Sequence, residues 1–440
     1  MSSWWCEYAW LPPGTVAHRV LVTTAAGRIV SVEPDVEAPA EAVRLRGLVI
    51  PGFANVHSHA FHRALRGHVQ SGRGDFWTWR DQMYDVAQQL DPDTYLALAT
   101  AVYAEMALAG ITCIGEFHYL HHAPGGTRYG DPNVMGRSLI EAAAAVGVRL
   151  ILLDACYLNG GFGAPLQGAQ LRFGDGDAQS WSTRVELLAG EENVRVGAAI
   201  HSVRAVSLDD MAFVAKVAAD RGLPLHFHLS EQVAENEQCA AFYGRTPARV
   251  LADAGALGAQ STAVHATHLA DGDIALLARS SSGVCLCPTT ERDLADGIGP
   301  AGALAAAGIP LTLGSDSHAV IDLFEEMRAT EMGERLATHG RGNFTAAALL
   351  ESATVAGHRA LGWPDAGEIA PGNRADLVAV DLQSARTAAG GASAETVAFA
   401  ATAADVTDVV VDDRQIVRDR RHVEIDVASA LTTAIAAVRG

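Results

Sequence analysis

The sequence is poor in charge and has no long hydrophobic run. Only 19% of its 440 residues are charged, less than in an average soluble protein. No segment offers eighteen uninterrupted apolar residues, and the N-terminus lacks a basic stretch followed by an apolar one. We therefore expect no membrane-spanning helix, no secretory signal and a cytoplasmic location.

Positive charge is the scarcer sign. The 32 Lys and Arg residues are outnumbered by 51 Asp and Glu residues, and the formal net charge is −19. Such a chain repels a phosphate backbone, and no Lys- or Arg-rich run offsets that repulsion locally. The composition therefore predicts no nucleic-acid partner and no docking on a membrane. A small acidic ligand would have to be held by a local group of arginines.

Cysteine is sparse and scattered. The cysteines never form a C-x-x-C pair, so the sequence predicts free buried thiols in a reducing compartment. Cys285 and Cys287 alternate within GVCLCP and share one face of a predicted strand, but two thiols without further ligands are weak evidence for a metal site. The six cysteines are Cys6, Cys113, Cys156, Cys239, Cys285 and Cys287.

Apolar residues are abundant and regularly arranged. They make up 49% of the chain, which suits a large α/β body. From Pro51 onward, short apolar segments alternate with longer amphipathic ones, and eight such strand-helix units predict a TIM-like (β/α)8 barrel. The predicted strands are VIPGFANVH (49–57) and residues 112–117, 149–155, 194–201, 223–229, 262–266, 283–288 and 310–316.

Both chain ends are typical of antiparallel β-structure. Residues 17–50 alternate between apolar and polar and contain turn signals, as do residues 375–382 and 406–419. We therefore predict a small composite β-sandwich, built from both ends around the barrel. The predicted division is residues 1–50 for the first part of the sandwich, 51–365 for the barrel, and 366–440 for the second part with a C-terminal helix.

Two connecting segments carry clear local signals. Asp91 can cap a helix whose first turn contains Pro92 and which Gly110 ends. The glycine-rich residues 157–168 follow the third predicted barrel strand and form a candidate lid.

The first chemical motif is His57-Ser58-His59, at the end of the first predicted barrel strand. Residues two apart on a strand share a face, so both imidazoles can reach one metal ion. An H-x-H pair is also common by chance, and a polar strand end with two solvated histidines needs no metal. This motif alone leaves both interpretations open.

Three further strands end in groups of the same kind. HFHLSEQ ends the fifth strand with His228 and then Glu231, whereas His226 is expected to lie deeper without a metal role. The sixth and eighth strands end in VHATH and LGSDSH, which contain His265, His268, Asp316 and His318. Barrel enzymes keep their active sites at these strand ends. A nitrogen-rich set with one carboxylate suits Zn²⁺ or Fe²⁺ better than Mg²⁺ or Ca²⁺.

Such a site supports hydrolysis. A metal lowers the pKa of a bound water from near 16 to about 7, and a carboxylate can accept its proton while the oxygen attacks a trigonal carbon. Asp316, which would touch metal and water, is predicted to accept that proton. Glu231, which lies off the metal, is predicted to protonate the substrate nitrogen. His265 is predicted to hydrogen-bond the water or the developing charge.

The motifs NVHSH, HLSE, VHATH, GSDSH and GEIAPGNRADLVAVD together resemble the amidohydrolase superfamily, in its branch of metal-dependent deaminases. The resemblance spans nearly the whole chain and implies a (β/α)8 barrel within a composite β-sandwich. It also implies one divalent transition metal, zinc with iron as the alternative, and by analogy a homodimer. The implied metal ligands are His57, His59, His228 and Asp316, with Glu231 and His265 as catalytic partners.

A narrower set of motifs, HSHAFHRALRG, DFWTWRDQMY, GEFHYLHH and IHSVRAV, resembles the formimidoylglutamate deiminase family of histidine degradation. The resemblance implies hydrolysis of N-formimino-L-glutamate to N-formyl-L-glutamate and ammonia. That substrate is a small dicarboxylate, which guanidinium groups suit well. The positions that serve substrate binding in the family are Arg80, Tyr119, His201 and Arg204 here.

One position departs from the family pattern. Members of that family carry Gln where His62 stands, so an imidazole replaces a side-chain amide at a position that faces the substrate. The neighbouring Arg63 and Arg66 are expected to be solvated or ion-paired. Phe76, Trp77, Trp79 and Tyr84 are expected to pack the segment that carries Arg80 rather than to contact a ligand.

Three functions are open at this point. The first is the formiminoglutamate deiminase, and the second is a deaminase of another formimino or guanidino acid or of an aminated ring such as guanine. Ring deaminases need stacking surfaces, whereas the predicted mouth offers two arginines. The third is a catalytically silent barrel used as a scaffold, in which metal ligands are lost, yet none is missing from this sequence.

Overall fold

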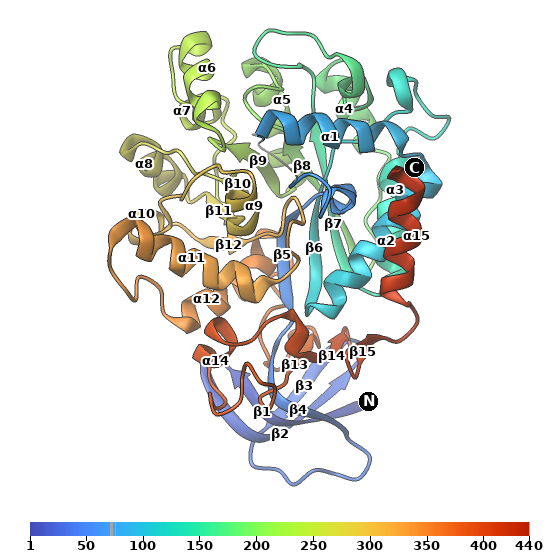
Figure 1. Ribbon diagram of the computed structural model, residues 1–440, viewed down its shortest axis with the longest axis vertical. Coiled ribbons are helices and arrows are strands. Elements are labelled where there is room, and N and C mark those ends of the chain that lie inside the picture. Colours follow the sequence, from blue (N-terminus) through green and yellow to red (C-terminus); the bar gives the residue numbers. More distant parts are fainter. Residues whose placement is uncertain (71–73, 75, 440) are drawn as a thin grey trace.

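The computed structural model describes residues 1–70, 74 and 76–439, and its strands form two sheets of eight strands each (Figure 1). In the first sheet every neighbouring pair is parallel, in the chain order β5 to β12. Its strands are β5 (Phe53–Ser58), β6 (Ile111–His118), β7 (Arg149–Cys156), β8 (Val194–Ile200), β9 (Leu225–Leu229), β10 (Ser261–His265), β11 (Gly283–Leu286) and β12 (Leu311–Leu313). The predicted (β/α)8 barrel is confirmed.

The barrel closes between its first and last strands. An isolated parallel bridge joins Ser58 to Asp316. The N–H of Asp316 donates to the carbonyl of His57 at 3.0 Å, and the N–H of His59 donates to the carbonyl of Asp316 at 3.3 Å. Backbone pairing therefore brings the H-x-H segment beside the aspartate that lies about 260 residues further along the chain.

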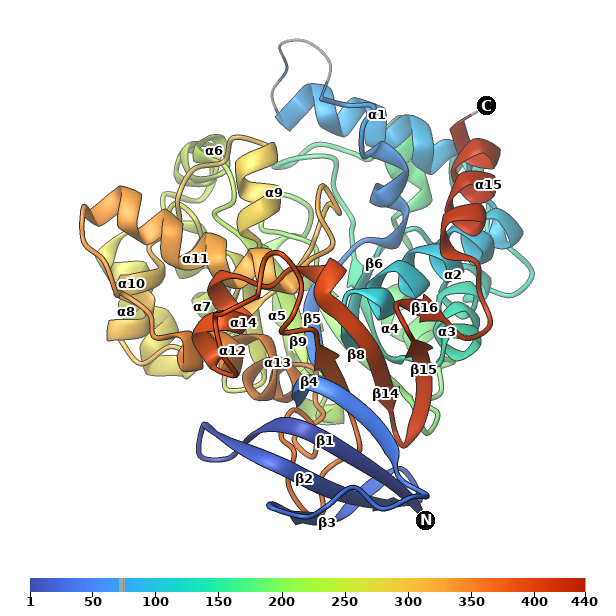
Figure 2. The same ribbon diagram turned by 60° about the horizontal axis from the view of Figure 1, so that its bottom comes forward.

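Helices follow the strands and cover the outside of the barrel (Figures 1 and 2). Asp91 caps α2 by accepting a hydrogen bond from the N–H of Thr94, as the sequence predicts. The helices are α1 (Phe76–Gln89), α2 (Pro92–Leu108), α3 (Val134–Val146), α4 (Ala178–Val185), α5 (Leu208–Arg221), α6 (Val233–Tyr243), α7 (Pro247–Asp253), α8 (Asp271–Ser280), α9 (Pro288–Asp293), α10 (Ala301–Ala306), α11 (Leu323–Thr338), α12 (Ala346–Ala353), α13 (Val355–Ala360), α14 (Ala394–Phe399) and α15 (Val427–Arg439).

The second sheet draws its strands from both chain ends, as predicted. Its order is β16-β15-β14-β13-β4-β1-β2-β3, so strands from the C-terminal part pair with strands from the N-terminal part through β13 and β4. A separate apolar core that includes Trp4, Val22 and Leu377 supports it. The strands are β1 (Ser2–Leu11), β2 (Thr15–Ala25), β3 (Arg28–Glu33), β4 (Val43–Pro51), β13 (Leu377–Val380), β14 (Val406–Val411), β15 (Arg414–Arg418) and β16 (Arg421–His422).

The structure departs from the sequence-based expectation at the first barrel strand and at β1. The segment VIPGFANVH is divided between the sheets, because β4 runs to Pro51 and β5 begins at Phe53. The sequence pattern also missed β1, in which a register shift between Cys6 and Tyr8 interrupts the alternation of buried and exposed residues. The domain limits at residues 50/51 and 365/366 stay predictions.

The two ends of the barrel are differently covered. The second sheet lies at one end, and α1 lies across the other (Figure 1). The C-terminal helix α15, which was expected, packs beside α2 on the outside of the barrel. Within the described part of the chain, no helix combines the length and apolar character that crossing a bilayer would require.

Candidate active site

A pocket lies at the C-terminal ends of the barrel strands, beneath α1. Every predicted site residue except His57 lines it, and His57 is fully buried next to His59. The lining residues from the barrel side are His59, His62, Tyr119, Tyr157, Phe173, His201, Arg204, His228, Glu231, His265, Leu294 and Asp316, and those from α1 are Phe76, Trp79, Arg80, Met83 and Tyr84. The fold thus brings residues predicted from seven separate motifs into one cavity.

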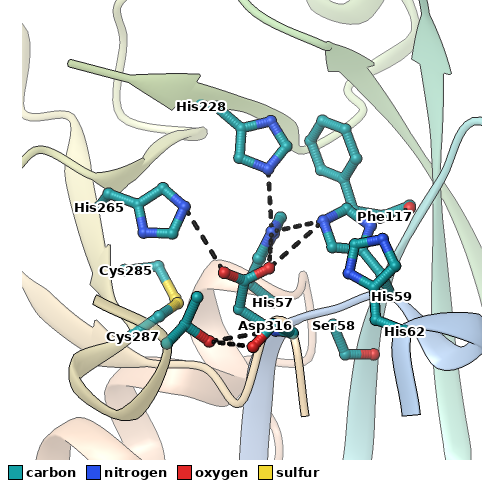
Figure 3. A network of polar contacts seen from close by, with 12 residues as sticks. His57, Ser58, His59, His62, Phe117, His228, His265, Cys285, Cys287 and Asp316 are labelled. Carbon is teal, nitrogen blue, oxygen red and sulfur yellow. Dashed lines mark hydrogen bonds and ion pairs between the residues drawn. The ribbon is translucent and has the colours of Figure 1, made fainter. Parts of the chain in front are cut away.

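Four possible metal donors converge in this pocket (Figure 3). His57 Nε2 lies 3.1 Å from the Nε2 atoms of both His59 and His228. Asp316 Oδ1 lies 3.4 Å from His57 Nε2 and 3.4 Å from His59 Nε2. Donors bound about 2.1 Å from one ion, at angles of about 90 to 109°, lie about 3.0 to 3.4 Å apart. The spacing of the four atoms therefore matches a shared cation.

Hydrogen bonds to main-chain carbonyls set the tautomers of two of these histidines. His59 Nδ1 lies 2.9 Å from the carbonyl of Phe117, and His228 Nδ1 lies 2.8 Å from the carbonyl of His201. Because a carbonyl only accepts, each Nδ1 carries the proton and each Nε2 turns a lone pair toward the cluster. A proton on His57 Nε2 could satisfy only one of these lone pairs, whereas a cation among them satisfies both.

Burial favours the neutral imidazoles that a metal requires. It lowers the pKa of His57, and it lowers the pKa of His59 and of His228 well below the usual histidine value. Burial opposes ionisation of Asp316, but the hydrogen bond to His57 and the neighbouring imidazoles hold its pKa well below the usual value. Three neutral nitrogens and one carboxylate fit a divalent transition metal.

A metal held by these donors would stabilise the protein, and its removal is expected to destabilise it, because a ligand that binds only the native state raises its stability. Elemental analysis of the purified chain should find close to one transition-metal ion per chain. A chelator should remove that ion and lower the Tm by several degrees, and Zn²⁺ should restore the Tm. Purified protein that contains no transition metal and is fully active would contradict the site.

Gly314 allows β12 to approach β5 at the donor cluster. An added Cβ at this position would lie 2.9 Å from both the Cβ and the carbonyl oxygen of His57. Gly314→Ala is therefore expected to lower the free energy of unfolding by about 1 to 3 kcal/mol. It should also reduce the metal content, because the added methyl group would push β12 away from β5 and so separate Asp316 from His57.

Gly283→Ala on the neighbouring strand is the matched control, because the nearest atom to its Cβ would lie 3.6 Å away. Denaturant unfolding and elemental analysis of both variants measure the effect. Full metal content together with unchanged stability in Gly314→Ala would show that the close approach does not matter.

Glu231 and His265 lie beside the donor cluster without joining it. His265 Nε2 lies 3.8 Å from Glu231 Oε1 and 3.7 Å from Asp316 Oδ2. Burial raises the pKa of Glu231 to about 7, so this carboxyl can hold or release a proton near neutral pH. Burial alone would lower the pKa of His265, but the surrounding carboxylates, Glu231 first, raise it well above the usual value. The pair can therefore exchange protons with a ligand in the pocket.

Two arginines reach the pocket from different elements. Arg204 follows β8, and its Nε donates to Glu235 Oε2 at 3.0 Å, while a terminal nitrogen lies 3.9 Å from Glu231 Oε2. Arg80 lies on α1 with its guanidinium carbon 4.4 Å from the ring centroid of Trp77. The Nε atom of Arg80 has no hydrogen-bond partner among the described residues. Arg204 is thus held in place by a carboxylate, whereas Arg80 stacks on an aromatic ring.

His62 contacts a second predicted substrate-binding residue. Its Nε2 lies 2.8 Å from the hydroxyl of Tyr119, and its ring packs edge-on against Trp79 with centroids 5.1 Å apart. Burial lowers the pKa of His62 to about 3, so the imidazole is neutral. His201 lies nearby, with its ring centroid 5.6 Å from that of Tyr119, and burial lowers its pKa well below the usual value.

The wall opposite the donors is aromatic. Phe76, Trp79 and Tyr84 of α1 line the pocket, and Phe76 also packs against Trp77 and Trp79 as expected. Whether any of these rings contacts a ligand stays a prediction, because helix periodicity does not reveal which face of α1 turns toward the barrel. Asp75, the first residue of the DFWTWRDQMY motif, lies outside the described residues.

Several histidines and arginines have structural roles. His226 lies deeper in β9 and contacts the carbonyl of Ala360, as expected. Arg63 and Arg66 both form ion pairs with Glu105, at 2.7 and 2.6 Å. The remaining histidines from the strand-end motifs stay outside the donor cluster, because His268 contacts the carbonyl of Asp296 and His318 contacts the hydroxyl of Ser315.

Sequence reasoning missed two buried glutamates that hold predicted site residues. Glu235 on α6 binds Arg204 and also accepts the N–H of Ser230 at 2.9 Å. Glu291 on α9 lies 3.4 Å from His265 Nδ1. Glu235 lies three residues after HLSEQ and four positions after Glu231, so a second acidic residue close to this strand end was a usable sequence signal. For Glu291 no comparable sequence signal exists.

The fold and the site together define a hydrolase built on a (β/α)8 barrel, with a nitrogen-rich donor set and an acid-base pair at the strand ends. The chain belongs to the amidohydrolase family, whose profile matches residues 48–416. It is therefore an enzyme that acts on C–N bonds other than peptide bonds.

Relatives span nearly the whole chain. Formimidoylglutamate deiminase of Pseudomonas aeruginosa is 37% identical over 437 residues, which cover 96% of each protein. A 5-methylthioadenosine/S-adenosylhomocysteine deaminase of Halobacterium salinarum is 30% identical over 420 residues, which cover 93% of this chain and 90% of that protein.

Solved structures agree with the fold. An amidohydrolase from Brucella melitensis superposes with a TM-score of 0.92 at 34% identity and full coverage of both chains. An adenosine deaminase from Xanthomonas campestris, solved with bound zinc, superposes with a TM-score of 0.84 at 25% identity, covering 99% of this chain and 97% of that one.

Proposed function

We propose that this chain hydrolyses N-formimino-L-glutamate to N-formyl-L-glutamate and ammonia, as a step of histidine degradation. The observation that carries the proposal is a single pocket in which Arg80 and Arg204 accompany the metal donors. A chain with a net charge of −19 has no general attraction for a dicarboxylate, so paired arginines beside the reaction centre indicate an anionic substrate. The 37% identity to formimidoylglutamate deiminase supports the same substrate.

Each group in the pocket has a task in this reaction. His57, His59, His228 and Asp316 would hold one zinc ion, with iron as the alternative. A divalent ion in such a site polarises water and lowers its pKa. Asp316 accepts a proton from the attacking water, and His265 donates an N–H toward the charge that develops. Glu231 carries a proton to the departing nitrogen, so the formimino carbon gains a C–O bond and loses its C–N bond as ammonia leaves.

The substrate carboxylates are assigned to the arginines and their neighbours. Arg80, whose Nε has no hydrogen-bond partner among the described residues, binds one carboxylate, and Arg204, oriented by Glu235, binds the other. Tyr119 and His201 add hydrogen-bonding groups to the pocket that the two arginines line. His62 is neutral and pairs with Tyr119, so it acts on substrate choice through the position of that hydroxyl.

An ammonia-release assay tests the proposal. The zinc-loaded enzyme is given N-formimino-L-glutamate, N-formimino-L-aspartate, N-guanidino-L-glutamate and guanine at matched concentrations. We expect the highest kcat/KM for N-formimino-L-glutamate. A higher kcat/KM for the guanidino acid or for guanine would overturn the substrate assignment while leaving the hydrolytic site intact.

A ring deaminase is the second candidate, and the aromatic wall favours it. Phe76, Trp79 and Tyr84 provide flat surfaces on which a heterocycle could stack. The deaminase of Halobacterium salinarum that matches this chain is named for adenosine derivatives. The guanine arm of the assay, extended with adenosine, separates this candidate from the first.

Three further properties belong to the proposal. We place the enzyme in the cytoplasm, in agreement with its free buried cysteines. We also propose a homodimer by fold analogy, which light scattering of the purified enzyme tests. A catalytically silent scaffold is the least favoured alternative, because such relatives lose metal donors and all four are present here.

A further inference from the structure

Glu291 makes a direct contact with the catalytic histidine. It lies on α9, after β11, whereas His265 ends β10. Its Oε1 lies 3.4 Å from His265 Nδ1, and the residue is only 5% exposed. We propose that Glu291 is a positioning residue that orients His265 for hydrolysis. This inference rests on the proposed function for the role of His265, but not for the contact itself.

The direction of the hydrogen bond follows from a second contact. Glu291 Oε1 also accepts the N–H of Cys287 at 2.9 Å, so this oxygen acts as an acceptor. His265 Nδ1 must therefore carry a proton and donate it. The opposite ring nitrogen, Nε2, then faces Glu231 Oε1 at 3.8 Å and Asp316 Oδ2 at 3.7 Å. A flipped ring would present carbon atoms to Glu291 and to the reaction centre, so Glu291 selects the productive orientation.

Glu291 is not needed merely to anchor its own helix. The first turn of α9 is held separately by Glu326 of α11, whose Oε2 accepts the N–H of Thr289 at 2.9 Å and whose Oε1 accepts the Thr289 hydroxyl. Among the described residues, the only ion-pair partner of Glu291 is His265. A buried carboxylate is costly to keep without a partner. Its contact with a catalytic side chain, rather than with an arginine or lysine, points to a role in the site.

Kinetics of position 291 test the inference. Glu291→Leu, which removes the acceptor, is expected to lower kcat about 10- to 100-fold with KM changed less than about threefold, because a lost orienting partner typically has this effect. Glu291→Gln keeps an acceptor oxygen and should restore most of kcat. Glu326→Leu is the matched control, because it disturbs the same helix without touching His265, and it should retain most of kcat.

A double-substitution cycle separates positioning from general damage. If Glu291 acts through His265, adding Glu291→Leu to His265→Asn should lower kcat no further. Additive losses, or equal losses in Glu291→Leu and Glu326→Leu, would overturn the inference. Glu291→Ser, which keeps a hydroxyl for the Cys287 N–H, replaces the leucine variant in both tests if that variant does not fold.

A spectroscopic readout works without any substrate. In protein with ¹⁵N-labelled histidine, the His265 signals, assigned by their loss in His265→Asn, should show a protonated and hydrogen-bonded Nδ1. That signature should disappear in Glu291→Leu or Glu291→Ser and persist in Glu291→Gln and Glu326→Leu. Its persistence in the leucine or serine variant would refute the contact. If the signature disappears in these variants but the unsubstituted enzyme releases no ammonia from N-formimino-L-glutamate, the contact between Glu291 and His265 is supported and the proposed function is rejected.

Discussion

Replacing Glu231 by glutamine is expected to lower kcat by about 10²- to 10⁴-fold, the usual contribution of a general acid-base group. The amide has nearly the same shape but cannot donate a proton to the leaving nitrogen. Because Glu231 is not among the four converging donors, the variant should retain close to one metal ion per chain. Steady-state ammonia release and elemental analysis measure the two properties.

Glu237→Gln is the matched control for this prediction. Glu237 lies on α6, six residues after Glu231, and is exposed, so its replacement should leave kcat unchanged. A Glu231→Gln variant with near-normal kcat would remove Glu231 from the mechanism. Loss of metal together with kcat would instead mean that Glu231 supports the donor cluster.

Replacing Arg204 by methionine is expected to raise KM for N-formimino-L-glutamate by about 10- to 100-fold, because a bidentate, charge-assisted contact to a carboxylate is lost. The effect on kcat should be smaller, since Arg204 is not one of the four candidate metal donors. The variant also leaves Glu235 buried, 2% exposed, without its guanidinium partner. An unpaired buried charge could itself disturb the site.

The double variant Arg204→Met with Glu235→Gln removes that complication. It eliminates both charges, so any remaining rise in KM reports the lost substrate contact. Comparison with N-butylformamidine, an amidine without carboxylates, sharpens the test, because its kcat/KM should fall far less than that of the dicarboxylate. An unchanged KM for N-formimino-L-glutamate in both variants would assign its anchoring to Arg80 or another group.

Local patterns were sufficient to predict the barrel and the strand ends that carry candidate metal donors, whereas the particular set of four ligands was implied by the resemblance to the amidohydrolase superfamily. Strand alternation located the segments around His57, His228, His265 and Asp316, and parallel packing requires the C-terminal ends of such strands to meet at one rim. Strand order therefore places these residues at one rim, whereas the choice of four of them as metal ligands rests on the family resemblance. Alternation failed at β1, where a register shift interrupts it. It also failed where β4 passes into β5, because the chain changes sheet there within one apolar segment.

The sequence by itself determined the fold class and the rim at which the candidate metal-binding residues lie, because these depend on short-range periodicity and on the single direction of parallel strands. Only the tertiary structure decided which side chains support them. Glu291, Glu235 and the aromatic residues of α1 lie on helices whose side chains contact predicted site residues or line the pocket. The rotation of such a helix about its axis depends on packing against distant segments, and no local pattern records it.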